Sequence, residues 1–321
     1  MTEIEIKFQV TEDNTLELGL LLQNLTVLSS SEEVVNNRYF DTNQLELRNQ
    51  GMGLRIRHTD SMTEQTIKCG GKQSVGIHSR AEYNVPLSGA EQEAVPDLSL
   101  FPEEIWAVHV LREQIQAKLT MLFSTQFVRK QWLISFEDAE IELAWDRGSI
   151  STSSSSAIIN EFELELKSGD VTALFSLSHK LAGLKGLRFG TRSKAQRGYE
   201  LAKAETDGHT PLLTLEYLRL SYKEQIEVGL ERWLSHEQEW IASKGLERYL
   251  ALLKIMEAKT MIGNAAWHAR INADWLSTLS AQMNVLSHIQ KGDEPSLIAV
   301  LLGRDALRLQ LAITAWLYQQ A

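Results

Sequence analysis

The chain has 321 residues, 43% of them hydrophobic and 23% charged, which is enough to build the cores of two ordinary globular domains. Its net charge of −10 argues against a protein that binds nucleic acid non-specifically, because such proteins carry a basic excess. Cys69 is the only cysteine, so an internal disulfide or a cysteine-based zinc site is excluded within one chain. We find neither a secretory leader nor a membrane-spanning stretch, and we expect a cytoplasmic protein with no nucleic-acid or membrane partner.

The pattern up to about residue 205 predicts mainly strands, joined by short polar turns and a few helices. Apart from the N-terminal segment described below, strands are expected at residues 34–41, 53–58, 64–68, 76–87, 125–135, 139–145 and 157–167. Helices are expected at 15–25, 101–119 and 171–184, where apolar residues recur at helical spacing. The serine-rich residues 149–156 lie between two alternating segments and are expected to form a hairpin loop.

After Pro211 the pattern is helical throughout. The next proline is Pro295, and Ile226, Leu230 and Trp233 lie along one helical stripe. Residues 297–318 are expected to form another strongly apolar helix. We therefore expect four or five helices, packed as a C-terminal bundle over residues 211–321.

Two distant segments alternate acidic and apolar residues. Glu3, Glu5 and Lys7 are separated by isoleucines, and a period of two places all three charges on one face of a strand. Residues 161–167 repeat the pattern, with glutamates at 161, 163 and 165 and a lysine at 167. One explanation is a solvated sheet face with weak cross-strand ion pairs. Repeated carboxylates in two strands instead favour a cation held between them.

Basic residues alternate in the same way elsewhere. Arg55 and Arg57 share one face of a strand, Lys68 follows in the next, and residues 140–146 add a further acidic strand. If these strands converge on one cavity, its carboxylates could bind a divalent metal while its Arg and Lys side chains bind a polyanion. The ligand that needs both is a phosphate chain complexed with a metal.

Seven short motifs, taken in order, resemble those of the CYTH superfamily, also called triphosphate tunnel metalloenzymes. They are Glu3-x-Glu5-x-Lys7, Tyr39-Phe40-Asp41-Thr42, Arg55-x-Arg57, Lys68, Arg80-x-Glu82, Glu163-x-Glu165 and Ser193-Lys194. The resemblance covers residues 1–205 and implies an α+β fold, in which an eight-stranded antiparallel β-barrel forms a tunnel with flanking helices and precedes the C-terminal α-helical bundle. A barrel of this size encloses room for about one small ligand. Residues 211–321 resemble a shortened or divergent CHAD domain, and their role is open.

The resemblance also implies roles for individual residues. Mg²⁺ or Mn²⁺ would be bound by Glu3, Glu5, Glu163 and Glu165, with Asp146 and Glu142 as outer ligands. The phosphates would be bound by Arg55, Arg57, Lys68 and Arg80, with Arg38, Arg129 and Arg188 as further candidates. Catalysis would depend on Lys7, Lys194 and Glu5, the lysines stabilising charge that develops on the phosphate.

The expected activity is metal-dependent hydrolysis of inorganic triphosphate to diphosphate and phosphate, by attack of a metal-activated water. No aromatic pocket for an organic group is evident in the sequence, which favours the inorganic substrate. A thiamine or nucleoside triphosphatase of the same family, or a non-catalytic sensor that binds polyphosphate or a nucleotide, are the alternatives. The helical domain could shield one tunnel mouth, stabilise the barrel or bind a protein partner.

Overall fold

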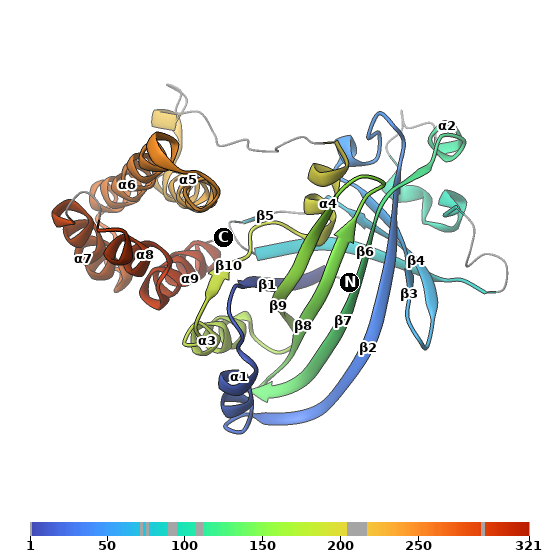
Figure 1. Ribbon diagram of the computed structural model, residues 1–321, viewed down its shortest axis with the longest axis horizontal. Coiled ribbons are helices and arrows are strands. Elements are labelled where there is room, and N and C mark those ends of the chain that lie inside the picture. The colour runs from blue at the N-terminus through green and yellow to red at the C-terminus, as the bar shows by residue number, and fades with distance from the viewer. Residues whose placement is uncertain are drawn as a thin grey trace.

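The computed structural model describes residues 2–70, 73–74, 77–88, 95–106, 112–203, 217–289 and 293–320. For residues 2, 3, 73, 74, 77–80 and 203 it describes the backbone only. In this part of the chain, ten strands form one antiparallel sheet in the order β10-β1-β9-β8-β7-β2-β3-β4-β6-β5 (Figure 1). The strands are β1 (Thr2–Val10), β2 (Thr26–Asp41), β3 (Gly53–His58), β4 (Thr63–Cys69), β5 (Gln73–Ser74), β6 (Ile77–Pro86), β7 (Thr120–Phe136), β8 (Ala139–Ser151), β9 (Ser156–Ser168) and β10 (Leu187–Phe189).

Strand β1 is paired along both of its edges. One edge pairs with β9, and the other pairs first with β6, over residues 2–6, and then with β10, over residues 8–10. Because β6 lies near the far end of the strand order, the pairings from β1 through β9, β8, β7, β2, β3, β4 and β6 lead back to β1. The expected antiparallel sheet is therefore confirmed.

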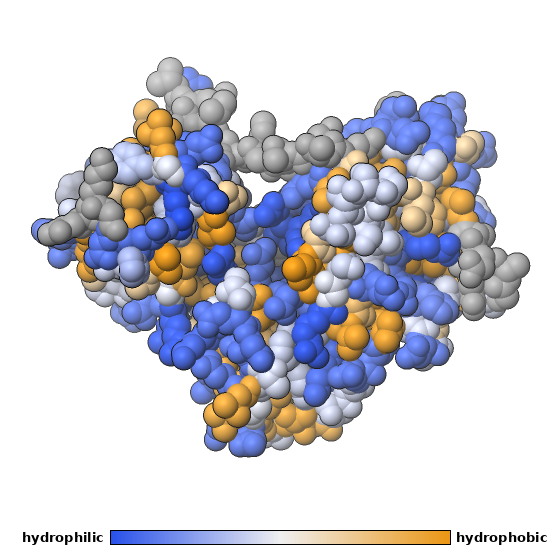
Figure 2. Space-filling model, in the orientation of Figure 1, coloured by the Kyte–Doolittle hydropathy of each residue, from blue (hydrophilic) through white to orange (hydrophobic). Residues whose placement is uncertain are grey.

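Helices flank the sheet and then form a separate group, α5–α9, beside it (Figure 1). Within the sheet region lie α1 (Thr15–Leu22), α2 (Arg112–Gln116), α3 (Val171–Leu181) and α4 (Lys194–Lys203), with 3-10 turns η1 (Arg48–Gln50), η3 (Leu98–Leu100) and η4 (Glu103–Ile105). After η5 (Tyr217–Arg219) follow α5 (Tyr222–Ala242), α6 (Gly245–His268), α7 (Trp275–His288), α8 (Glu294–Leu302) and α9 (Arg304–Gln319). Figure 2 shows hydrophilic residues gathered around a hollow between this helical group and the sheet.

Two helix predictions need correction. The single helix expected over 101–119 is wrong: the described residues there form only the short η4 and α2. The helix expected over 297–318 is divided into α8 and α9 at Gly303. Gly303 has an extended backbone, with φ −74° and ψ 169°, and a Cβ there would lie 2.1 Å from the carbonyl oxygen of Ala299. The expected domain boundary between residues 205 and 211 lies outside the described residues.

The serine-rich hairpin is confirmed, although its loop is shorter than expected. Strand β8 continues to Ser151 and β9 begins at Ser156. The turn between them is closed by a hydrogen bond from the Thr152 N–H to the Ser155 carbonyl oxygen, 2.9 Å long.

The two faces of the sheet differ as the alternation predicts. Ile6, Phe8, Phe162 and Leu164 are fully buried on one face of β1 and β9. They belong to one apolar core that also includes residues of α3 and of the C-terminal helices. The charged residues of the same strands therefore project from the opposite face.

Among the described residues, no helix has both the length and the apolar character needed to cross a bilayer.

Candidate functional site

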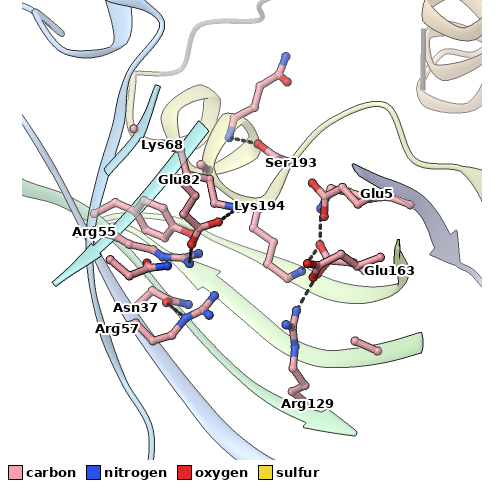
Figure 3. Close-up of a pocket in the computed structure, with 18 of the residues that line it drawn as sticks. Glu5, Asn37, Arg55, Arg57, Lys68, Glu82, Arg129, Glu163, Ser193 and Lys194 are labelled. Atoms are coloured by element: carbon pink, nitrogen blue, oxygen red, sulfur yellow. Dashed lines mark hydrogen bonds and ion pairs between the residues drawn. The ribbon is translucent and has the colours of Figure 1, made fainter. Parts of the chain in front are cut away.

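A cavity of about 1170 Å³ lies on the charged face of the sheet (Figure 3). Described side chains from β1, β2, β3, β4, β6, β7, β8 and β9 line it, together with the first residues of α4. Figure 3 shows Arg55 and Arg57 on one side and Glu5 and Glu163 on the other. The alternating acidic and basic strands therefore do converge on one cavity.

Strand register explains why the carboxylates meet. Lys7 lies opposite Glu163 in the β1–β9 pair, and Glu161 lies opposite Asp146 in the β9–β8 pair. Directly opposed residues project from the same face of a sheet with their Cβ atoms about 5 Å apart. Ala144, opposite Glu163, adds only a methyl group and leaves space beside this carboxylate.

Two lysines enter this group from different elements. Lys7 Nζ lies 2.7 Å from Glu5 Oε2 and 2.5 Å from Glu163 Oε1. Lys194 Nζ, at the start of α4, lies 2.6 Å from Asp146 Oδ2, 2.5 Å from Glu161 Oε1 and 3.0 Å from Glu163 Oε1. Both ammonium groups are almost completely buried.

Two arginines complete the group. Arg129 donates from Nε and Nη2 to both oxygens of Asp146, at 2.7 and 2.6 Å, and from Nη2 to Glu163 Oε2 at 2.6 Å. Arg197 donates to Glu161 Oε2 at 3.1 Å. We refer to the four carboxylates Glu5, Asp146, Glu161 and Glu163 as the acidic cluster. Among the described side chains, four cations form ion pairs with it and match its charge: Lys7, Lys194, Arg129 and Arg197.

The pKa values in the acidic cluster follow from these contacts. Burial alone would lower the pKa of Lys7, but the carboxylates of Glu163, Glu5 and Glu161 raise it well above its usual range. Burial would raise the pKa of Glu163, but Lys194, Lys7 and Arg129 hold it well below its usual range. Lys7 and Glu163 are therefore both charged at neutral pH.

Helix α4 is fixed against the cavity-lining face by close packing. A Cβ on Gly198 would lie 2.0 Å from the ring of Phe123, so only glycine permits this approach. The hydroxyl of Tyr199 donates to Asp41 Oδ2 at 3.4 Å. Asp41 also accepts from the backbone N–H groups of Leu47 and Arg48, which supports a structural role for the Tyr39–Thr42 motif. The packing of α4 thus places Lys194 inside the cavity.

The opposite side of the cavity is basic, and we refer to its residues Arg55, Arg57 and Lys68 as the basic wall. Glu82 Oε1 lies 3.3 Å from Arg55 Nη2, and Glu82 Oε2 lies 2.8 Å from Lys68 Nζ. Arg57 donates from Nε to Asn37 Oδ1 at 3.2 Å. Within the described part of the chain, Arg57 forms no ion pair with a carboxylate. Among the described side chains, Arg57 thus lacks a carboxylate within ion-pair distance, although the charge of Glu64, opposite it in the β3–β4 pair, partly offsets the fall of its pKa.

The pKa of Arg57 reflects this imbalance. Burial lowers it first, and the neighbouring charges of Arg55 and Arg129 lower it further, to about 10. A cation whose charged form is disfavoured by other cations is stabilised when an anion binds. Arg57 is therefore the residue of this wall best suited to receive an anionic ligand.

The pKa of Glu82 leads to a prediction about acid stability. Burial alone would raise this pKa, but Lys68 and Arg55 lower it to about 2, from 4.5 in the unfolded chain. Between these pH values the unfolded chain binds the proton more strongly, so the stabilisation from Glu82 is complete above pH 4.5 and is lost as the pH falls towards 2. We expect Glu82→Gln to lower the melting temperature most at neutral pH and least near pH 3, in thermal unfolding followed by circular dichroism. A difference that is independent of pH would contradict this.

The acidic cluster also fits a divalent metal ion. Oxygen atoms from Asp146, Glu161 and Glu163 lie within 4.8 Å of one another. Carboxylate oxygens are hard ligands of the kind that Mg²⁺ and Mn²⁺ bind, and three of them can hold one ion.

The structure brings most of the predicted site residues to the cavity, and it places some elsewhere. The lining includes Glu5, Lys7, Arg55, Arg57, Lys68, Arg129, Glu142, Glu163, Glu165 and Lys194, while the side chain of Asp146 contacts two of them from a fully buried position. Glu142 and Glu165 are both paired with Lys167, at 3.4 and 2.8 Å, away from Lys194. Glu3 and Arg80 face each other in the β1–β6 pair, but their side chains are outside the described part of the structure.

Arg38 and Arg188 do not line the cavity. Arg38 lies between Asn37 and Tyr39, which face the cavity, so its side chain projects from the other face, with its guanidinium 5.9 Å from the ring centre of Phe40. Arg188 lies on β10, where burial lowers its pKa and the charge of Glu237, in α5, opposes that shift. Neither is included in the site proposed below.

Sequence reasoning did not assign a role to several residues of the site. Glu161 belongs to the same alternation as Glu163, and that pattern alone could have identified it. Arg197 follows Lys194 by three residues, the spacing that places two side chains on one face of a helix. For Asn37, which positions Arg57, the sequence offers no signal that we can identify.

The fold and the site define an antiparallel-sheet protein with a cavity whose opposed acidic and basic walls would suit a small anion together with cations. Comparison with known families agrees with this description. The model of the CYTH domain matches residues 1–199. The chain belongs to the CYTH domain family, and the resemblance seen in the sequence is confirmed.

Individual relatives were also found. An inorganic triphosphatase from Haemophilus influenzae is 36% identical over 206 residues, which are 64% of this chain and 56% of that protein. The chain thus matches little more than half the length of this relative. A solved structure from Hippeastrum, described as an adenylyl cyclase candidate with a dominant triphosphatase activity, has 20% identity, a TM-score of 0.45 and coverage of 64% of this chain and 97% of its own.

Proposed function

We propose that this protein is a metal-dependent hydrolase that cleaves inorganic triphosphate to diphosphate and phosphate within the cavity. The observation that carries this proposal is the meeting of a paired acidic cluster, across one cavity, with a basic wall in which Arg57 has no ion pair among the described residues. The family membership and the similarity to an inorganic triphosphatase support it.

The charge distribution favours a metal–triphosphate complex as the ligand. The four carboxylates of the acidic cluster are balanced by four protein cations, so a metal ion alone would add positive charge to a buried neutral group. A triphosphate alone would meet carboxylates as well as cations. Together the two ligands bring opposite charges, the anion to Arg57 and the metal to the acidic cluster, and each reduces the cost of burying the other.

The basic wall would bind the substrate, and the acidic side of the cavity would carry the catalytic lysines. Arg55, Arg57 and Lys68 would bind phosphate oxygens, the arginines by paired hydrogen bonds and the lysine as a point charge. Lys7 and Lys194 lie on the acidic side of the cavity and remain protonated, so they would stabilise negative charge that develops on the phosphate during cleavage. Arg129 would hold Asp146 and Glu163 in place through its three hydrogen bonds.

Asp146, Glu161 and Glu163, with Glu5 close by, would hold Mg²⁺ or Mn²⁺. When bound, the ion would neutralise phosphate charge and lower the pKa of a water molecule that attacks the phosphoanhydride bond. Glu165, Glu142 and Glu3 remain candidates for outer positions.

We further infer that the circuit of strand pairings through β1 and β6 is the eight-stranded tunnel that the family resemblance implies. The pairing of β1 with β6 supports this, since it joins the strand that bears Lys7 to the basic wall. The CYTH-like domain would then comprise residues 1–205 and the helical domain residues 211–321.

Aromatic side chains bear on the choice of substrate. Tyr39, Phe127 and Tyr199 line the cavity, which the sequence did not indicate. Tyr39 is stacked on Phe123 at 4.5 Å, Lys194 Nζ lies 5.2 Å from the Phe127 ring centre, and Arg48 lies 4.7 Å from that of Tyr199. Each of these rings is therefore already in contact with another ring or a cation of the protein. This favours a substrate without an organic group that would have to stack on them, over a thiamine or nucleoside triphosphate.

Phosphate release from inorganic triphosphate, ATP and thiamine triphosphate, with Mg²⁺ or with Mn²⁺, tests the proposal. We expect kcat/KM for inorganic triphosphate to exceed the other two by at least about tenfold, because the extra organic group finds no dedicated pocket. The Glu163→Gln variant, purified in parallel, controls for a contaminating phosphatase. A preference for either organic substrate would favour the alternative enzyme, and tight triphosphate binding without release in either metal would favour a sensor.

A further inference from the structure

The loop that precedes Lys194 is attached both to the sheet and to the C-terminal helices. Residues 190–193 join β10 to α4. The Gly190 N–H donates to the Lys7 carbonyl oxygen at 2.8 Å. A Cβ on Gly190 would lie 2.9 Å from the Lys7 Cβ, so glycine is required for this approach. The start of the loop is thus bound to the backbone of one lysine of the site, and its end bears the other.

Arg192, in the middle of this loop, connects it to the helical region. Its Nη1 donates to Glu200 Oε2 in α4 at 2.9 Å. Its Nη2 donates to Gln238 Oε1 in α5. The Gln238 Nε2 in turn donates to Thr191 Oγ1 at 3.5 Å. Two consecutive loop residues are therefore held by one side chain of the C-terminal helices.

Gln238 is itself held in a rigid setting. The neighbouring Glu237 accepts from Gln310 Nε2 in α9 at 2.7 Å, which ties α5 to α9. Helix α9 packs against α3 and β10, and the ring of Tyr318 lies 6.0 Å from that of Phe175 (Figure 1). Apolar residues of β10, α3, α5 and α9 belong to one buried core. The helical region is therefore a fixed support rather than a loosely tethered attachment.

We propose that the C-terminal helical region positions Lys194 for catalysis, through the contact of Gln238 with Arg192 and Thr191. This inference rests on the proposed function, because it assumes that Lys194 acts on the phosphate. Gln238 and Arg192 are positioning residues, since they act through the loop and α4. Small displacements of a catalytic group lower the rate strongly, so the contact affects turnover more than substrate affinity.

The test compares the Gln238→Ala, Arg192→Ala and double variants with the wild-type chain. We expect Gln238→Ala to lower kcat for triphosphate about three- to tenfold with little change in KM, from loss of this positioning. Arg192→Ala lowers kcat at least as much, because it also loses Glu200. The double variant is no worse than Arg192→Ala, because both changes remove the same contact. The Gln238→Glu variant keeps an acceptor for Arg192 and retains most of the activity.

Gln225→Ala is the matched control, because this glutamine also lies on α5. Its side chain donates to the Leu220 carbonyl oxygen, just before the same helix, and not to the loop. Amide hydrogen exchange supplies a readout independent of activity. We expect faster exchange in residues 190–203 of Gln238→Ala, with protection in α6–α9 preserved, and no such change in Gln225→Ala. Unchanged exchange and unchanged kcat in Gln238→Ala overturn the inference, as does an equal loss in Gln225→Ala. If the wild-type chain releases no phosphate, the proposed function fails, and the exchange measurement still decides whether the helices hold the loop.

Discussion

Replacing Glu163 by glutamine is expected to lower kcat for triphosphate by at least about 100-fold, the effect usually seen when a preorganised charged group is removed from an active site. Glu163 contacts three cations, Lys7, Lys194 and Arg129. A glutamine would turn an amide N–H₂ group towards these cations and would remove one of the three carboxylates suited to a metal. Steady-state phosphate release measures the loss.

The same substitution should also reduce stability. Removing one partner of a buried charged group leaves the others uncompensated, which commonly costs about 3–5 kcal/mol. We therefore expect a lower melting temperature for Glu163→Gln, and activity must be compared at a temperature where circular dichroism shows the variant folded. Glu140→Gln is a suitable control, since Glu140 is an exposed carboxylate on the adjacent strand β8. Wild-type turnover in the folded Glu163→Gln protein would refute the assignment of this site.

The residues that the sequence correctly placed on one face are those whose position is governed by strand geometry. Alternation in β1 and β9 placed Glu5, Lys7 and Glu163 on one face, because successive side chains of any strand point to opposite sides. The same rule applied to β2 would have shown that Arg38 lies on the face opposite Asn37 and Tyr39. Charge alone made Arg38 a candidate for binding phosphate, whereas its position on the strand directs it away from the cavity.

What the sequence could not predict depends on contacts between distant elements. Arg188 lies between Leu187 and Phe189, which are buried in the core shared with the C-terminal helices, and only the packed structure places it near Glu237. The break between α8 and α9 was concealed because the apolar spacing continues across Gly303. The bridge from Arg192 to Gln238 spans 46 residues and involves two polar side chains that no local pattern distinguishes.

The two walls of the cavity are balanced differently, and this separates stability from binding. The acidic cluster is satisfied within the protein, so its members support the fold as well as the proposed chemistry. Arg57 has no carboxylate partner within the described residues, so the folded protein is penalised by its charge until an anion binds. Substitutions in the acidic cluster should lower both the stability and the activity of the protein. A substitution of Arg57 should lower only its affinity for the anion.

Arg57→Met should therefore weaken triphosphate binding and stabilise the free protein. Hydrogen bonds between charged groups contribute about 1.5–3 kcal/mol, so KM should rise about 10- to 100-fold. Replacing this partly buried cation, whose charge Arg55 and Arg129 disfavour, by an apolar side chain of similar length should raise the free energy of unfolding by about 1 kcal/mol. The measurements are KM for triphosphate and the melting temperature without ligand, at the same pH and salt concentration.

Arg38→Met is the matched control, because Arg38 lies opposite Ile56 in the adjacent strand and projects away from the cavity. It should leave KM unchanged, since its guanidinium does not reach the ligand. Triphosphate should also raise the melting temperature of the wild-type protein more than that of Arg57→Met, because at one concentration a tighter ligand stabilises the folded state more. A fall in stability of the ligand-free Arg57→Met protein would show that Arg57 supports the fold, and the proposed anion site would then have to lie with Arg55 and Lys68 instead.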